Sequence, residues 1–231
     1  MGLLDFIFPK RCVACKSFGS YLCADCFSFL SFSQGGFCLI CNKASIDSLT
    51  HPGCHTRYAI DGAFASLVYA GVMKRLVYTF KYKPYLTDLQ SVLIDLFYEG
   101  IIQNETFHKV VNKKALFVPI PLFSAKLRSR GYNQAEILST RLAKRLGLTS
   151  ANLLQRTRNT SSQFRLSRKE RQENISRAFS PISKNRVQIE GKELFLVDDV
   201  VTSGATLVEA AKVLKRGGAK AVFGLALAHG Q

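Results

Sequence analysis

The sequence has few acidic residues and no long hydrophobic run. Its 231 residues include 16 Asp and Glu against 32 Lys and Arg, so the formal net charge is +16. This excess favours polyanionic partners such as nucleic acid, phosphorylated substrates or an anionic membrane surface, although a basic surface can also serve solubility alone. Residues 1–9 lack the basic start and cleavage site of a secretory signal. Because no run reaches the roughly 20 apolar residues of a membrane span, we expect a cytoplasmic protein that is not integral to a membrane.

Cysteine is absent after residue 54, although seven cysteines precede that point. They form three Cys-x-x-Cys pairs and a single cysteine between two histidines: Cys12 and Cys15, Cys23 and Cys26, Cys38 and Cys41, then Cys54 flanked by His51 and His55. This uneven distribution predicts a cysteine-rich domain over residues 1–57. The remaining residues, 58–231, are long enough to bury one ordinary core and form a second domain.

The cysteine spacing predicts structural zinc. A Cys-x-x-Cys turn aims two thiolates at one ion, and two such turns complete a tetrahedral site. In the simplest arrangement the first four cysteines hold one zinc, while Cys38, Cys41 and Cys54 hold another with His51 or His55; an interleaved pairing is the alternative. Disulfides are disfavoured by the odd count and the expected compartment. Metal would supply most of the folding energy of so short a segment.

A second pattern spans residues 193–206 and reads Glu-Leu-Phe-Leu-Val-Asp-Asp-Val-Val-Thr-Ser-Gly-Ala-Thr. The apolar run before the acids predicts a buried parallel strand, and the apolar spacing after residue 206 predicts a helix. Ligands bind beyond the carboxyl ends of such strands, where free N–H groups at a helix start attract anions. The loop expected to wrap a phosphate consists of Thr202, Ser203, Gly204, Ala205 and Thr206.

The residue types in and before this loop restrict the class of ligand that it can bind. It contains no Lys, which argues against a Walker-type nucleotide loop. Asp198 and Asp199 are acceptors when ionised, so they suit ribose hydroxyls directly or through a divalent metal. The plain alternative is that the two acids merely end a strand and cap a helix.

The remaining chain alternates strands and helices, which predicts an α/β fold with a mostly parallel sheet. We expect strands at 63–69, 115–120 and 221–228, and helices at 73–102, interrupted near Pro84, and at 133–147. Residues 124–132 are expected to form a basic loop at the same sheet edge as the phosphate loop. There Lys126 and Arg130 could bind pyrophosphate, or could belong to a solvated loop.

Residues 156–177 are rich in arginine and are expected to form a long polar loop. Loops of this length in a compact domain are usually functional or disordered. A lid that excludes water from the site is one interpretation. A nucleic-acid arm is the other, with Arg165 and Arg168 on phosphates and Phe164 stacked on a base.

At residues 197–206 the chain resembles the type I phosphoribosyltransferases, whose signature is this carboxylate pair followed by a phosphate loop. The resemblance implies that Asp198 and Asp199 hold the ribose hydroxyls and that Thr202 to Thr206 hold the 5-phosphate of phosphoribosyl pyrophosphate. It also implies a Mg²⁺-bound donor, with substitution at the anomeric carbon and departure of pyrophosphate. The expected fold class is therefore an α/β phosphoribosyltransferase-like domain with flanking helices, preceded by a small zinc-binding domain.

Further segments resemble the competence protein F family. They are Val-Pro-Ile-Pro-Leu at 118–122, Arg-Gly-Tyr-Asn-Gln at 130–134, Arg-Thr-Arg-Asn-Thr at 156–160, the residues Gln163, Arg168, Arg171 and Asn174, and the cysteine pairs. The resemblance implies a role in natural transformation, in which single-stranded DNA is handled at the cytoplasmic side of the inner membrane beside the competence machinery. Two departures are the single Cys54 in place of a last pair and His229 where Arg is expected.

Two functions of different classes follow. In one, the protein binds phosphoribosyl pyrophosphate with Mg²⁺ and handles single-stranded DNA during uptake. The pocket for phosphoribosyl pyrophosphate then serves a regulatory or structural role. In the other, it is an active phosphoribosyltransferase on a base or amine, with Lys126 and Arg130 stabilising the departing pyrophosphate. Nucleotide salvage is disfavoured because such enzymes need no zinc appendage. The motifs identify no acceptor.

Overall fold

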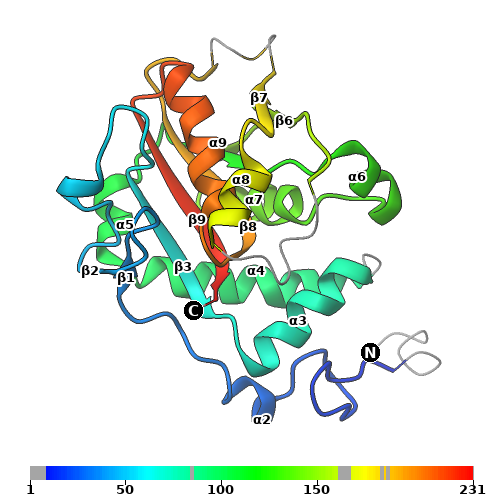
Figure 1. Ribbon diagram of the computed structural model, residues 1–231. Coiled ribbons are helices and arrows are strands. Elements are labelled where there is room, and N and C mark those ends of the chain that lie inside the picture. Colours follow the sequence, from blue (N-terminus) through cyan, green and yellow to red (C-terminus); the bar gives the residue numbers. More distant parts are fainter. Residues whose placement is uncertain (1–8, 84–85, 161–167, 183–184, 186–187, 231) are drawn as a thin grey trace.

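The computed structural model describes residues 9–83, 86–160, 168–182, 185 and 188–230. Its centre is a five-stranded parallel sheet in the order β3-β9-β8-β4-β5 (Figure 1). The strands are β3 (Gly62–Val68), β4 (Leu116–Pro119), β5 (Thr149–Ser150), β8 (Glu193–Val201) and β9 (Ala221–His229). The predicted α/β class with a mostly parallel sheet is confirmed.

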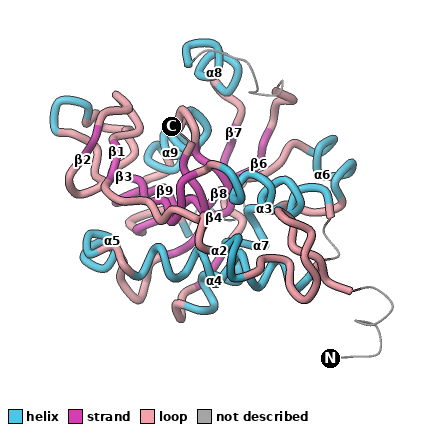
Figure 2. The backbone as a smooth tube through the Cα atoms, turned by 90° about the horizontal axis from the view of Figure 1, so that it is seen from below, coloured by secondary structure: helices cyan, strands magenta, loops and turns pink. Residues whose placement is uncertain are grey.

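Helices cover both faces of this sheet (Figure 2). They are α3 (Gly71–Tyr82), α4 (Thr87–Ile102), α5 (Glu105–Val110) and α7 (Gln134–Arg145) on one face, and α8 (Arg168–Ile175) and α9 (Ala205–Arg216) on the other. Phe195 and Val197 of β8 pack in the first layer, while Leu194 and Leu196 pack in the second. The unbroken apolar run of this strand is thus buried on both sides, as a central parallel strand requires.

Two segments predicted as loops contain regular structure. Residues 124–132 include the helix α6 (Ser124–Arg130), which ends at Gly131 with a left-handed φ of 79°. The segment 156–177 contains α8, and it begins and ends beside the antiparallel pair of β6 (Leu154–Arg156) and β7 (Phe179–Pro181). Both predictions of a loop were wrong because neither segment has the apolar periodicity that marks a helix in sequence. Phe164 and Arg165 lie outside the described residues, as does the side chain of Arg168.

The cysteine-rich segment has little regular structure of its own. It contains α2 (Ala24–Phe27), the short antiparallel pair β1 (Gly36–Phe37) and β2 (Ala44–Ser45), and the 3-10 turn η1 (Pro52–Cys54). In Figure 1 its first part, with α2, lies below α3, and its second part, with β1 and β2, lies beside β3. Two isolated bridges, Phe32 to Leu67 and Leu49 to Gly62, attach it to β3.

Among the helices of the described ranges, none is long and apolar enough to cross a bilayer.

Candidate anion site and metal centres

The first four cysteines converge on one point. The sulfurs of Cys12, Cys15, Cys23 and Cys26 all lie within 4.8 Å of one another. The turn that brings the first pair together closes through the Lys16 N–H, which donates to the Cys12 carbonyl at 3.0 Å, with Lys16 at a φ of 70°. We call this cluster the first metal centre.

A second cluster repeats this construction. Cys38, Cys41, Cys54 and His51 bring their ligand atoms within 4.8 Å of one another. Its turn closes through Asn42, whose N–H donates to the Cys38 carbonyl at 2.7 Å and whose φ is 62°. We call this cluster the second metal centre. The grouping within both centres is the sequential one.

The surroundings of the two histidines distinguish their roles. His51 Nε2 lies 2.9 Å from the Ala44 carbonyl and donates to it, which leaves Nδ1, 3.3 Å from the Cys41 sulfur, as the ligand atom. Fixing a metal-binding imidazole through its other nitrogen is usual in zinc sites. His55 points elsewhere, with Nε2 at 3.2 Å from Asp61 Oδ1. His51 is therefore the residue placed to complete the second set.

Both donor sets fit Zn²⁺, which binds four Cys or three Cys and one His in structural sites. Within each set, neighbouring thiols resist joint ionisation. Burial and hydrogen bonds with Cys15 and Cys12 raise the pKa of Cys26 to about 12, and burial with a hydrogen bond to Cys41 raises that of Cys54 to about 11. Four thiolates, or three beside an imidazole, can share so small a space only when a dication offsets their charge, and coordination deprotonates such thiols outright.

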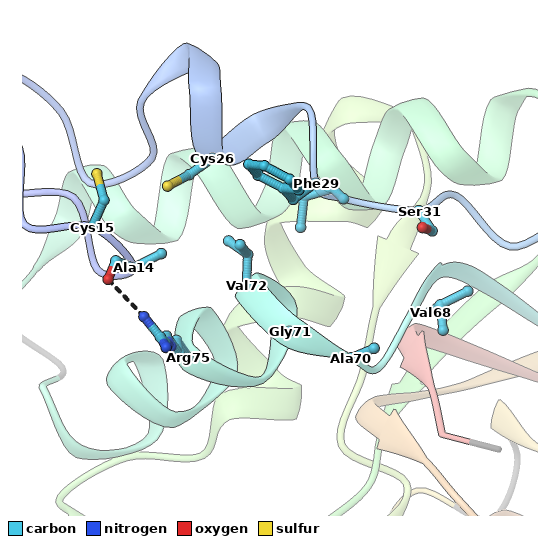
Figure 3. Close-up of a pocket in the computed structure, with 11 residues that line it drawn as sticks. Ala14, Cys15, Cys26, Phe29, Ser31, Val68, Ala70, Gly71, Val72 and Arg75 are labelled. Atoms are coloured by element: carbon cyan, nitrogen blue, oxygen red, sulfur yellow. Dashed lines mark hydrogen bonds between the residues drawn. The ribbon is translucent and has the colours of Figure 1, made fainter.

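The first metal centre sits beside a groove against α3. Arg75 Nη1 donates to the Ala14 carbonyl at 2.6 Å, and the groove runs between Cys26 and Phe29 on one side and Val72 on the other (Figure 3). This hydrogen bond joins the cysteine-rich segment to the rim of the α/β domain.

The predicted phosphate loop connects β8 to α9. Gly204 occupies the position before α9 with a left-handed φ of 72°. A Cβ atom there would lie 2.4 Å from Leu39 Cδ2, so the glycine permits close contact with Leu39, the residue after the ligand Cys38. The Ser203 hydroxyl is buried without a hydrogen-bond partner among the described residues. A buried unpaired donor at a helix start suits an anion.

The two carboxylates are the sixth and seventh residues of β8 and enter a pocket. Asp199 is buried, and its Oδ2 lies 2.9 Å from Lys81 Nζ. Burial and the charge of Asp199 raise the pKa of Asp198 to about 7, against the opposing effect of Lys81. Burial tends to lower the pKa of Lys81, but the adjacent Asp199 prevails and raises it. A cation close to Asp198 would therefore favour its ionised form.

Cationic side chains surround the same pocket, which has a volume of about 190 Å³. They are Lys81, Lys126, Arg130 and Arg156. Burial and the charges of Arg156 and Arg130 lower the pKa of Lys126, whose Nζ donates to the Thr160 carbonyl at 3.4 Å. With four cations against two carboxylates, the pocket has room for the charge of a polyanion.

The sequence predicted that Lys126 and Arg130 lie at the same sheet edge as the phosphate loop, and the structure places both in the pocket around Asp198 and Asp199. It missed Lys81, because the end of α3 carries no local motif and only the folded chain brings it to Asp199. Arg156 belongs to the Arg-Thr-Arg-Asn-Thr motif at 156–160, but its position in the pocket was not predicted. Arg171 adds a contact, since its Nη1 donates to Thr202 Oγ1 at 3.1 Å.

Two segments of the chain match known protein families. Residues 3–56 match the family described as double zinc ribbon domain, and residues 127–230 match the phosphoribosyl transferase domain. Competence protein F of Haemophilus influenzae is 29% identical over 92% of this chain and 99% of that protein. Competence protein ComFC of Bacillus subtilis is 28% identical over 89% of this chain and 83% of that protein. The DNA utilization protein YhgH of Escherichia coli K12 is 36% identical over 46% of this chain and 45% of that protein.

Proposed function

We propose a function from the premise that the chain is a homologue of competence protein F, ComFC and YhgH, with a double zinc ribbon domain and a phosphoribosyltransferase domain. It binds phosphoribosyl pyrophosphate with Mg²⁺ in the pocket around Asp198 and Asp199. It also handles single-stranded DNA during uptake in natural transformation, in the cytoplasm and beside the competence machinery of the inner membrane. Structural Zn²⁺ occupies both metal centres.

One observation carries the donor part of this proposal: carboxylates, an anion loop and cations line or border one small pocket. Each matches a different part of the donor. The carboxylates accept from the ribose hydroxyls and, when ionised, hold Mg²⁺. The 202–206 loop suits the 5-phosphate, and Lys126, Arg130 and Lys81 suit the pyrophosphate. We call this cavity the donor pocket.

Mg²⁺, when bound, would offset the charge of the pyrophosphate and of the two carboxylates. Asp198 and Asp199 would position it, and Lys81 would exchange its ion pair with Asp199 for contacts to phosphate oxygens. Because this requires an ionised Asp198, donor affinity should rise as the pH passes through the value of about 7 to which burial and Asp199 raise its pKa.

The donor part is tested by calorimetric titration of phosphoribosyl pyrophosphate with and without Mg²⁺. Asp198→Asn with Asp199→Asn should weaken binding by at least about tenfold, or about 1.4 kcal/mol. The matched control is Glu193→Gln at the opposite end of the same strand, where Glu193 pairs with Lys220 at 2.8 Å. Donor binding that ignores both Mg²⁺ and the Asp variants would sink this part.

The DNA part rests on the family relationship and on the net charge of +16. Phosphate contacts make affinity fall steeply between about 50 and about 200 mM salt. Anisotropy of a labelled single strand should show that slope, and Arg165→Gln with Arg168→Gln should reduce it. A strand affinity that stays flat with salt, or is unchanged in this variant, counts against the arginine-rich segment.

An active phosphoribosyltransferase is the second candidate, favoured by three cations in the donor pocket, Lys126, Arg130 and Arg156. They would stabilise the departing pyrophosphate while the acceptor nitrogen bonds to the anomeric carbon. Pyrophosphate release in the presence of donor, Mg²⁺ and a panel of bases, amines or single-stranded DNA tests this. Release no faster than in buffer, with donor shown to bind, would exclude catalysis on that panel.

A further inference from the structure

Two tyrosines lie exposed, one turn apart, on α3. Tyr78 is 65% exposed and Tyr82 is 57% exposed. Their ring centroids are 4.7 Å apart with a tilt of 47°. Two adjacent aromatic faces left in solvent forgo the burial that usually stabilises such side chains. Their exposure therefore points to a ligand with flat apolar faces.

Positive charge surrounds this pair without any carboxylate on the same helices. The helix α3 carries Lys74, Arg75 and Lys81, and α6 carries Lys126, Arg128 and Arg130, while neither helix contains an acid. Arg130 places its guanidinium 5.8 Å from the centre of the Tyr82 ring. Aromatic rings among cations suit a ligand that carries both rings and negative charge.

A cavity of about 320 Å³ connects this surface to the donor pocket. Lys81, Tyr82, Lys126, Ser129 and Arg130 line it, and its three cations also line the donor pocket. Crowding of like charge lowers the pKa of Lys126, after the larger effect of its burial. An anion in this cavity would relieve that repulsion, so the two cavities form one positively charged path that opens at Tyr82.

We propose that Tyr78, Tyr82 and Arg130 form a stacking platform for single-stranded nucleic acid. Bases lie on the two tyrosine rings, and phosphates follow the cations of α3 and α6. The inference deepens the DNA part of the proposed function and rests on it, because it names the surface that contacts the strand. It places a bound base at the mouth of the donor pocket.

The chemistry favours a single strand over other occupants. A single strand exposes the base faces that a duplex covers, and aromatic rings interleaved with cations are how proteins bind it without sequence preference. A second copy of the chain is disfavoured, because each copy carries a charge of +16 and like charges repel. An anionic membrane would also attract Lys and Tyr, so vesicles enter the test as a separate arm.

The chain contains no tryptophan, which makes a direct reporter possible. Tyr82→Trp introduces a single indole, whose fluorescence should be quenched when an unlabelled oligothymidylate of about 15 nucleotides stacks on it. Saturating strand with no change in the indole signal overturns the platform.

Affinity measurements separate stacking from charge. Tyr78→Leu with Tyr82→Leu should weaken binding of a labelled strand by at least about fivefold, since stacking contributes about 1–3 kcal/mol per base. The salt slope should not change, because no cation is removed. Tyr78→Phe with Tyr82→Phe keeps the rings and should retain the affinity. The control is Phe29→Leu, an aromatic side chain 75% exposed on the cysteine-rich segment, which should leave it unchanged.

The outcomes are distinguishable. Unchanged affinity in the double Leu variant overturns the platform but leaves the DNA function standing. A wild-type protein that binds no strand at about 50 mM salt overturns both. Loss of binding to phosphatidylglycerol vesicles in the Leu variant, with strand affinity intact, overturns the nucleic-acid assignment in favour of a membrane. Circular dichroism and zinc content establish that each variant is folded.

Discussion

The two metal centres are built alike but have different neighbours. Each closes a cysteine turn with a left-handed residue, Lys16 in the first and Asn42 in the second. The first borders α3, to which it is joined by the hydrogen bond from Arg75 to Ala14. The second reaches the phosphate loop through Leu39, which follows its ligand Cys38 and contacts Gly204. Similar local chemistry therefore supports an attachment to α3 in one case and the packing behind Gly204 in the other.

The contacts of the second metal centre come from the residues on either side of Cys38. Leu39 is buried against Gly204, where α9 begins. Phe37 stacks flat on His229, with ring centroids 3.7 Å apart and an angle of 7° between the planes. Because Cys38 lies between them, holding it on a metal also holds Leu39 behind the loop. We expect metal in the second centre and donor affinity to be coupled.

The largest expected effect is the loss of a ligand from each centre in turn. Cys38→Ser should lose one zinc per chain and weaken donor binding by at least about tenfold, because the support behind Gly204 loosens. Cys12→Ser should also lose one zinc but keep the donor affinity. Mass spectrometry of the native protein and calorimetric donor titration check both. Equal losses of donor affinity in the two variants would break the comparison.

A smaller change tests the contact without touching a ligand. Leu39→Ala should lower the free energy of unfolding by about 2–4 kcal/mol and weaken donor binding several-fold, with both zincs retained. Val13→Ala is the matched control, because Val13 is buried beside Cys12 as Leu39 is beside Cys38; it should destabilise the chain without altering donor affinity.

Direct contact between Leu39 and the loop can be isolated by a double-mutant cycle. Gly204→Ala forces a side chain into a left-handed position against Leu39, and Leu39→Ala should relieve part of the cost. We expect a coupling of about 1 kcal/mol in urea unfolding. Additive effects would mean that the two residues act independently.

Changing Asp198 alters the donor pocket without removing a ligand of either metal centre. It therefore separates the effect of the pocket from the effect of the metal centres. Burial and Asp199 raise the pKa of Asp198 to about 7, above its ordinary value of about 3.9. Between those two values the folded chain binds more protons than the unfolded chain, so this group lowers stability progressively as the pH rises. Asp198→Asn should therefore raise Tm more at about pH 8 than at about pH 5, while weakening Mg²⁺-dependent donor binding.

Measuring the difference between Asp198→Asn and the wild type cancels the pH dependence of the zinc centres, which both proteins share. A Tm difference that is the same at both pH values would show that Asp198 titrates normally. It would also remove the expected rise of donor affinity near neutral pH.

The smallest expected effect concerns the stacked rings of Phe37 and His229 beside the second metal centre. His229 Nε2 is buried without a hydrogen-bond partner in the described part of the chain, and burial lowers its pKa. His229→Phe keeps a ring on Phe37 and removes the unpaired nitrogen, so the chain should gain about 1 kcal/mol in urea unfolding. Zinc content should stay the same. A loss of stability would show that the nitrogen has a partner, such as water.

Much of the fold was predictable because its signals are local. The run from Leu194 to Val197 predicted a central strand, and Asn133 marked the start of α7, where its side chain accepts from the Ala135 N–H at 3.2 Å. The helices α6 and α8 were missed. Neither buries a continuous apolar stripe that could be seen as a period of 3.6 residues, so their sequences look like polar loops.

The departure at His229 has a structural explanation. The family resemblance led to an expected Arg at this position, and a guanidinium is planar and can stack on an aromatic ring. His229 makes the same kind of contact with its imidazole, face to face with Phe37. The substitution thus keeps a flat group between the end of β9 and the second metal centre.

The sequence by itself determined the chemistry of this protein: which turns present paired thiols to an ion, and which loop suits a phosphate. Such sets lie within a few residues of one another, so spacing along the chain specifies them. Only the tertiary structure decided which distant groups meet, as Lys81 meets Asp199, Leu39 meets Gly204 and Arg130 meets Tyr82. Those contacts depend on how helices pack on the sheet and where the zinc turns attach, and packing leaves no local pattern in the chain.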